Sequence, residues 1–294
     1  MLCAGQSQNT VESAGLASRR YERDDNYIGL HISFGVVEQV RRSFIVAMAR
    51  FSLEISYDGT GFLGWQSQPH GRGVQDAVEA ALRRLGESSR IVGAGRTDAG
   101  VHALAQVAHF DSVKDWEPRR LVLALNAHLP AGVSVMKAKS VSGNFHARRS
   151  AILREYRYFI WNSPTCYPHI KPYALWLTGS HYNWRRASDA ARVLAGEHDF
   201  GAFCRSADKP EDTIRTVKYA RLFRRGKLVV FRIVADSYLT NMVRIAVGNL
   251  IAVASGRRDE NWFRSLLDGT ADRRNSSETV AACGLFLWKV TYKE

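Results

Sequence analysis

Two hydrophobic periodicities succeed each other along this chain, and their order restricts the fold more than any other feature. Strand patterns, in which apolar residues alternate with polar ones, run over 51–57 and 154–161. A helical stripe of apolar residues with the spacing i, i+3, i+4, i+7 runs over 74–85. Strands and helices are therefore mixed in both halves, which predicts an α+β fold rather than a doubly wound nucleotide-binding fold.

The remaining elements are predicted from the same patterns and from turn residues. The segment 224–227 favours a hairpin, and a boundary near 142–151 separates two α+β subdomains, 48–146 and 151–294. Further strands are predicted over 90–94, 105–110, 133–141, 214–223, 228–234 and 285–292, and further helices over 117–129, 184–194, 240–254 and 259–268.

The first 47 residues differ from the rest of the chain. They are polar and show no sustained periodicity, whereas a strand pattern begins directly after Met48. We expect 1–47 to be either a disordered extension or the result of a translation start assigned too far upstream. No function is assigned to this segment.

The formal net charge of +13 belongs to the part of the chain that is predicted to fold. Five basic and five acidic residues cancel within 1–47, so the whole excess lies from Met48 onward. Such a domain attracts polyanions, with nucleic acid the first candidate and an anionic membrane the second. Charge alone fits a generic basic protein equally well.

Several classes of protein are excluded by what the sequence lacks. No apolar run reaches the roughly 20 residues of a spanning helix. The four cysteines contain no C-x-x-C pair, and none of the nine histidines has a Cys or another His at ligand spacing, so we expect no zinc site and no disulfide framework. We expect a protein of the reducing cytoplasm, without a metal.

The glycine-flanked loop 93–100 carries one carboxylate, Asp98. A dinucleotide fingerprint would need glycine at that position, and a phosphate-binding P-loop would need Gly-Lys-Ser/Thr, so ATP and NAD binding are not predicted. Two interpretations of Asp98 remain. It caps a short helix over 99–104, which the local pattern alone favours, or it meets a ligand on a loop that glycine keeps open.

The run 95–103, GRTDAGVHA, closely resembles the most diagnostic motif of the bacterial tRNA pseudouridine synthase A family, in which the aspartate is the catalytic nucleophile. Eight other segments resemble the family in the same order along the chain. The resemblance covers about 48–294. The eight segments are 57–66, 75–82, 105–110, 145–148, 154–158, 196–200, 241–244 and 284–287.

The resemblance implies an enzyme that isomerises uridine to pseudouridine at positions 38, 39 and 40 of the tRNA anticodon stem-loop. It implies two ferredoxin-like subdomains with mixed, mostly antiparallel sheets that flank a central active-site cleft. It also implies a homodimer and no cofactor. Asp98 would form an ester at C1′ or an adduct at C6, or the reaction would pass through a glycal, and the sequence leaves these pathways open.

The resemblance also assigns roles to three further residues. Tyr156 would stack on the flipped uracil and assist proton removal at C5, although without the resemblance it could be a core tyrosine like Tyr158. Arg244 would form an ion pair that orients Asp98 and keeps it ionised, although a solvated arginine fits the pattern too. Arg96 would flip the base out of its stack.

Four arginines beside the tyrosines are candidates for a groove that follows RNA phosphates. Each of them alone could equally be a solvated strand residue. A rival interpretation, a noncatalytic RNA-binding module on the same fold, needs only the basic charge, but such a module has no need to keep Asp98, Tyr156 and Arg244 together. The four arginines are Arg148, Arg149, Arg154 and Arg157.

Overall fold

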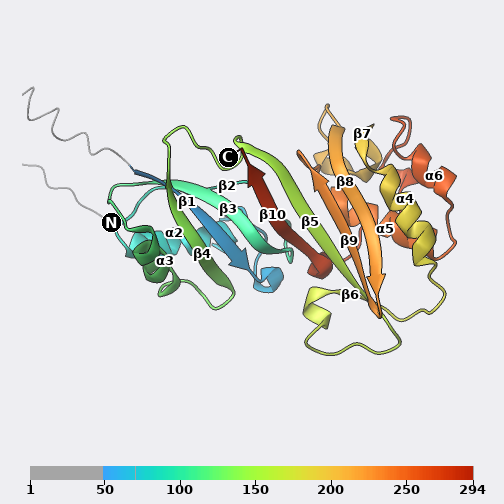
Figure 1. Ribbon diagram of the computed structural model, residues 1–294, viewed down its shortest axis with the longest axis horizontal. Helices are drawn as coiled ribbons and strands as arrows, with labels where there is room; N and C mark the ends of the chain where they lie inside the picture. Colours follow the sequence, from blue (N-terminus) through green and yellow to red (C-terminus); the bar gives the residue numbers. More distant parts are fainter. Residues whose placement is uncertain (1–48, 70, 294) are drawn as a thin grey trace, which may run out of the picture. The chain divides into compact units, whose positions relative to one another are not determined.

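A single mixed sheet runs through the part of the chain that the computed structural model describes, residues 49–69 and 71–293 (Figure 1). The predicted extension 1–47 lies outside these residues. The strands are β1 (Ala49–Tyr57), β2 (Val92–Gly93), β3 (His102–Ser112), β4 (Val133–Val141), β5 (Ala151–Asn162), β6 (Leu175–Leu177), β7 (Gly196–Asp199), β8 (Ile214–Arg225), β9 (Leu228–Ala235) and β10 (Leu285–Tyr292).

The strand order is β4-β1-β3-β10-β5-β9-β8-β7, with β2 paired to β3 and β6 paired to β5. All pairs are antiparallel except β3 with β10 and β5 with β6, which confirms the predicted α+β fold with a mixed, mostly antiparallel sheet. The last strand lies between β3 and β5. Its Leu287 is in register with Ala103 on one side and Tyr156 on the other. Segments far apart in sequence are thereby neighbours across one strand.

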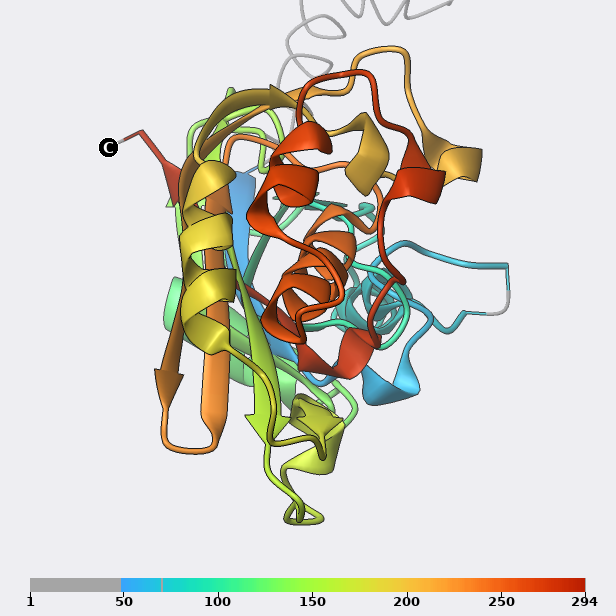
Figure 2. The same cartoon turned by 90° about the vertical axis from the view of Figure 1, so that its right-hand side faces the viewer.

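Five helices accompany the sheet in the described residues. Figure 1 shows α2 and α3 beside β1 and β4, and α4 to α6 beside β7 to β9. The helix α5 lies against both α4 and α6 (Figure 2). The bounds are α2 Val74–Arg84, α3 Pro118–Asn126, α4 Trp184–Val193, α5 Met242–Ala254 and α6 Glu260–Ser265.

The core lies on one face of the sheet, as the periodicities predict. Phe51, Leu53 and Ile55 of β1 are at most 1% exposed, whereas the residues between them are half-buried. In α5 every residue is buried except Arg244. A helix that is apolar all round is surrounded by other elements, and here these include α4 and a segment over 278–280.

The structure corrects several predicted boundaries. The strand predicted from 105 begins at His102, so no helix covers 99–104 and the interpretation of Asp98 as a helix cap is wrong. The helix predicted from 240 begins at Met242, because Asn241 has the left-handed φ of 64° and ends the loop before it. The short strands β6 and β7 were not predicted, since three or four residues carry too little periodicity.

The described residues contain no helix that is both long enough and apolar enough to cross a membrane.

Candidate active site

The loop between β2 and β3 carries Asp98 and is fixed through its backbone. The carbonyl of Thr97 accepts a hydrogen bond from the N–H of Trp65 at 3.0 Å. The Thr97 hydroxyl lies 2.8 Å from that of Tyr57, and Gln106 donates to the Gly95 carbonyl at 2.8 Å. We call residues 94–101 the Asp98 loop. Neighbouring segments therefore hold Gly95 and Thr97, which precede the carboxylate in the chain.

Two glycines of the segment 57–66 make room for this loop. A Cβ at Gly64, where φ is +94°, would lie 2.4 Å from the Thr97 carbonyl oxygen. A Cβ at Gly59 would lie 2.1 Å from the carbonyl oxygen of Val101. Only glycine allows this approach, because any side chain would overlap backbone atoms. The segment 57–66, which also resembles the family, therefore packs directly against the backbone of the Asp98 loop.

Asp98 faces Arg244, although 146 positions separate them in the chain. The Nη1 of Arg244 lies 3.3 Å from Oδ2 of Asp98 and also donates to Asn241 Oδ1 at 2.8 Å. Its Nε donates to the Val280 carbonyl at 2.9 Å. Arg244 stands in the first turn of α5, where the helix dipole is unfavourable for a cation, and the carboxylate offsets this. The Asp98 side chain is 38% exposed, so one side remains open to a ligand.

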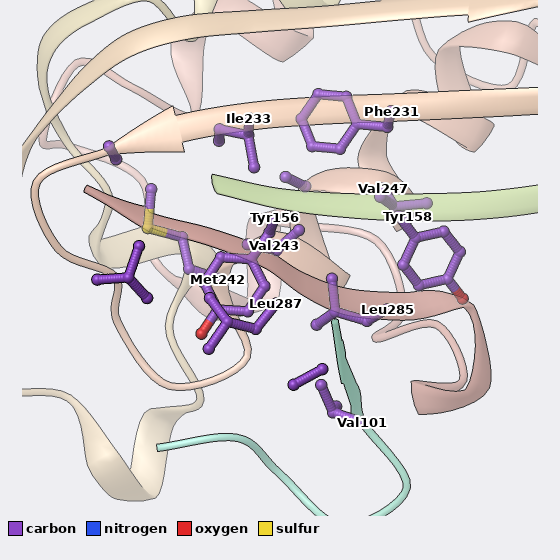
Figure 3. Packing of buried hydrophobic residues seen from close by; sticks show 14 of the residues in the cluster. Val101, Tyr156, Tyr158, Phe231, Ile233, Met242, Val243, Val247, Leu285 and Leu287 are labelled. Carbon is purple, nitrogen blue, oxygen red and sulfur yellow. The ribbon is translucent and has the colours of Figure 1, made fainter. Parts of the chain in front are cut away.

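Tyr156 of β5 forms the opposite wall. It belongs to the buried cluster that also contains Met242, Val243 and Leu287 (Figure 3), and only 8% of it is exposed. Its ring meets that of Tyr238 edge to face at 4.9 Å between centroids. We call β5, β10 and the start of α5 the Tyr156 wall. Burial, and secondarily the Asp98 carboxylate, raise the pKa of the Tyr156 phenol, so it is protonated at neutral pH.

Between the Asp98 loop and the Tyr156 wall lies a cleft of about 820 Å³. Six of the residues singled out in the sequence line it, namely Arg96, Asp98, Arg148, Arg149, Arg154 and Tyr156. Arg244 reaches Asp98 from behind the wall. The Nε of Arg96 donates to Oε1 of Gln66 at 3.0 Å, and its side chain is exposed at the mouth of the cleft.

Arg154 lines the cleft, but its hydrogen-bond donors are already used by backbone carbonyls of the protein. Its guanidinium donates to the backbone carbonyls of Ala94, Arg148, Ala151 and Asp236, at 2.6 to 3.4 Å. It thereby ties the Asp98 loop to β5. Burial lowers the pKa of this guanidinium. The nearby phenols of Tyr292 and Tyr156 and the carboxylate of Asp236 oppose this shift in part.

Arg157 does not join the others, because strand alternation turns it to the opposite face of the sheet. It forms an ion pair with Glu155 at 2.7 Å and stacks over the ring of Trp288 at 3.9 Å. Neither contact borders the cleft. The expected groove therefore contains Arg148, Arg149 and Arg154 without Arg157.

The sequence of this chain matches the profile of the family described as tRNA pseudouridine synthase over residues 54–148 and 190–293. The chain belongs to the tRNA pseudouridine synthase A family. It is 39% identical over 247 residues to tRNA pseudouridine synthase A of Geobacillus kaustophilus, covering 83% of this chain and 95% of that protein. It is 41% identical over 251 residues to tRNA pseudouridine synthase A of Beijerinckia indica, covering 84% and 95%.

A third relative, tRNA pseudouridine synthase A of Brachyspira hyodysenteriae, is 36% identical over 249 residues, covering 84% of this chain and all of that protein. The family membership confirms the resemblance inferred from the motifs and makes the chain an isomerase by family. Among solved structures, a Cbf5–Nop10–Gar1 complex is similar with a TM-score of 0.32 and 11% identity, covering 68% of this chain and 44% of that one. That likeness is too weak to support an argument.

Three residues of the cleft were not singled out from the sequence. Gln66 holds Arg96, Tyr238 supports the ring of Tyr156, and Asn241 holds the guanidinium of Arg244. Gln66 and Asn241 lie inside motifs that resemble the family, so their position was a usable signal. Tyr238 lies outside them, and its role depends on a contact between β5 and the segment after β9.

No group of three or more His, Cys, Asp or Glu side chains that could hold a metal ion occurs in residues 49–69 and 71–293.

Proposed function

We propose that this chain isomerises uridine to pseudouridine at positions 38, 39 and 40 of the tRNA anticodon stem-loop, with Asp98 as nucleophile. One observation carries the proposal. An open carboxylate, paired with Arg244 at 3.3 Å, shares a cleft with an aromatic ring that can stack on a base. The cleft is also lined by the arginines that a polyanionic substrate needs.

The reaction breaks the bond between N1 of uracil and C1′ of ribose and forms a bond between C5 and C1′. The proton on C5 is lost and a proton is gained at N1, so no oxidant or reductant is needed. A carboxylate divides this into two easier steps by an ester at C1′ or an adduct at C6, and a glycal route is the third possibility. In each route the Arg244 guanidinium orients Asp98 and offsets its charge.

Tyr156 acts in this proposal as the platform for the uracil ring, and its hydroxyl serves as a hydrogen-bond partner in the cleft. The raised pKa of the phenol makes it a poor proton acceptor while the Asp98 carboxylate is free. Once that carboxylate is bound to substrate, one of the two causes of the shift is removed. Burial, the larger cause, remains. In the ester and adduct routes this proposal places proton removal at C5 by Tyr156 after covalent attachment.

Arg96 is placed to take the position of the flipped base, since it is exposed beside the Asp98 loop and held by a single side-chain contact with Gln66. Arg148 and Arg149, which also line the cleft, contact RNA phosphates in this proposal. Arg154 contributes chiefly by tying the loop to β5, because its donors are used by backbone carbonyls.

We further propose a cytoplasmic homodimer whose subunits each comprise two ferredoxin-like subdomains, 48–146 and 151–294. A group of half-buried aromatic side chains on one face of the sheet supports the dimer. Phe286 meets Phe159 at 5.3 Å, and Trp288 lies next to Phe159, on the face that the helices leave uncovered. Leu104 is 46% exposed there. By light scattering we expect the wild type to be a dimer and Trp288→Glu to be a monomer. A monomeric wild type would contradict the proposed dimer.

The function is tested by replacing Asp98 with asparagine, which keeps the shape and removes the nucleophile. Unmodified tRNA tritiated at C5 of uridine releases tritium on isomerisation. We expect Asp98→Asn to slow release by at least about 10³-fold while tRNA binding persists. Asp189→Asn, an exposed change on α4, is the matched control and should act as wild type.

Undiminished release by Asp98→Asn would overturn the assignment of Asp98 as the nucleophile. Absence of release by the wild type would favour the noncatalytic interpretation. Stem-loops that keep uridine at only one of positions 38, 39 and 40 test the substrate. Absence of product from all three would contradict the proposed sites.

A further inference from the structure

A second hollow lies directly behind the Asp98–Arg244 pair, and no role proposed above uses it. Its volume is about 610 Å³. Asn241 lines both this hollow and the cleft, and Arg244 lines the hollow while reaching Asp98. We call it the rear pocket. It is lined by Arg205, Ser206, Ala207, Asn241, Arg244, Arg273 and Thr279.

The rear pocket collects positive charge without an acidic residue in its lining. Three of its seven lining residues are arginines, and none is Asp or Glu. Arg244 is offset by Asp98, and Arg205 has Asp208 at 3.6 Å, although 63% of the Arg205 side chain is exposed. The hydroxyls of Ser206 and Thr279 supply neutral donors beside these guanidinium groups.

Arg273 is the residue that lacks a compensating anion. Within the described residues no carboxylate lies at ion-pair distance from it, and its donors reach only the Ser276 carbonyl at 3.4 Å and the Thr279 hydroxyl at 3.0 Å. Burial lowers its pKa, with no neighbouring charge to oppose this. Asp272, which directly precedes Arg273 in the chain, forms an ion pair with Arg274 instead, at 2.6 Å. A half-buried, uncompensated guanidinium is typical of a site that receives an anion.

We propose that the rear pocket binds a phosphodiester group of the RNA backbone, one close to the target uridine, through Arg273 and Arg205. This inference rests on the proposed function and adds a contact to it. A chain whose uridine enters the cleft carries phosphates on both sides of that nucleotide, and the pocket adjoins the cleft at Asn241. A bound phosphate would also stabilise the segment 273–280, whose Val280 carbonyl holds Arg244.

The charge of Arg273 is tested by Arg273→Gln, with Arg273→Lys to restore charge and Arg274→Gln as the matched control, since Arg274 is 91% exposed and lies outside the pocket. Tritium release from the anticodon stem-loop is measured between about 50 and 200 mM salt. We expect Arg273→Gln to raise KM about tenfold at low salt and to reduce the slope of log KM against log salt by about 0.7. Arg273→Lys should keep the wild-type slope.

A purely structural role for Arg273 gives a different result. If it only clamps the segment through Ser276 and Thr279, Arg273→Gln and Arg273→Lys both lower the melting temperature and neither changes the salt slope. That outcome overturns the proposal. Equal slopes for Arg273→Gln and Arg274→Gln overturn it as well.

The phosphate itself is tested with stem-loops that carry one uncharged methylphosphonate linkage at each position around the uridine in turn. We expect one linkage that raises KM for wild type and leaves KM of Arg273→Gln unchanged. If every linkage affects both proteins alike, the pocket binds no backbone phosphate. If inorganic phosphate inhibits wild type and Arg273→Gln equally, free phosphate does not bind through Arg273 in the rear pocket. That result also contradicts the proposal. Wild type without any tritium release would instead refute the proposed function.

Discussion

The two walls of the cleft are built by different means. The Asp98 loop contains no helix or strand between β2 and β3, and hydrogen bonds to Thr97 and Gly95 together with the absent side chains of Gly59 and Gly64 define its path. The Tyr156 wall consists of strands and a buried helix, and Tyr156 is part of its apolar core. The Asp98 carboxylate is thus on the wall that lacks regular secondary structure.

This difference separates two kinds of side chain. Tyr156 belongs to the core and, in the proposed function, also to the substrate site, so a change that removes its ring should affect both stability and activity. Asp98 is a half-exposed side chain outside the apolar core, with 38% of its side chain exposed and Arg244 as its ion-pair partner. A functional residue on the loop can be replaced without damage to the core, whereas one on the wall needs a replacement that preserves its ring.

After Asp98 itself, the largest effect is expected where the walls meet, at Arg244. Arg244→Gln removes the charge that orients Asp98 and leaves the carboxylate facing neutral groups. Loss of one partner of such a partly buried pair costs about 3 kcal/mol, so kcat should fall roughly 100-fold. Single-turnover tritium release at saturating enzyme measures it, with Arg192→Gln on the exposed face of α4 as control. A kcat within twofold of wild type would mean that Asp98 needs no cation.

The Asp98 loop is expected to be sensitive to its glycine support. In Gly64→Ala the new methyl group meets the Thr97 carbonyl at 2.4 Å with φ at +94°, so we expect a loss of about 2 kcal/mol in unfolding free energy and a lower kcat. Gly226→Ala in the β8–β9 hairpin has a positive φ of 60° but open space around it, so only the backbone strain remains. Urea unfolding and kcat compare the two. Equal losses in activity would show that the clash does not reach Asp98.

The Tyr156 wall allows function and stability to be separated. In residues 49–69 and 71–293, the Tyr156 hydroxyl makes no hydrogen bond, whereas the Tyr158 hydroxyl donates to the Ala281 carbonyl at 2.7 Å. Tyr156→Phe should therefore leave the melting temperature unchanged and lower kcat about tenfold, by 1.4 kcal/mol. Tyr158→Phe should cost about 1 kcal/mol of stability and keep kcat. The reverse pattern in calorimetry and kinetics would exchange the two assignments.

The same difference explains what the sequence could predict. The strands and the helix of the wall follow from apolar periodicity, which predicted a strand over 285–292 and a helix over 240–254. The local sequence pattern alone favoured Asp98 as a helix cap. The contact of its loop with the glycines of 59–64 is not visible in the residues around Asp98. Only the family motif indicated the carboxylate as the reactive group.

Long-range contacts account for what was missed. Nothing local in Tyr238 indicates that it packs on Tyr156, and nothing local in Arg273 indicates that it lacks an anion while Arg274 has one. Arg157 was grouped with Arg154 because both lie beside the tyrosines in the sequence, but an odd separation in a strand places them on opposite faces. These assignments depend on strand register and on loops that cross α5.

The smallest effect is expected at Tyr57, where the loop touches the core. Tyr57→Phe removes the 2.8 Å contact with the Thr97 hydroxyl, which should cost about 1 kcal/mol of stability and change kcat by only about threefold. Burial raises the pKa of the Tyr57 phenol in the folded protein above its ordinary value of 10. The folded state therefore keeps a proton that the unfolded chain releases above about pH 10.

The stabilisation that results from this shift is complete below about pH 10 and is lost as the pH rises further, at about 1.4 kcal/mol per pH unit for one tyrosine. The Tyr57→Phe variant lacks this group, so its unfolding free energy should fall less steeply between pH 10 and 11 than that of wild type. Urea unfolding at the two pH values measures the slopes. Identical slopes would show that Tyr57 titrates alike in both states, and that the loop is less firmly attached to the core than its hydrogen bonds indicate.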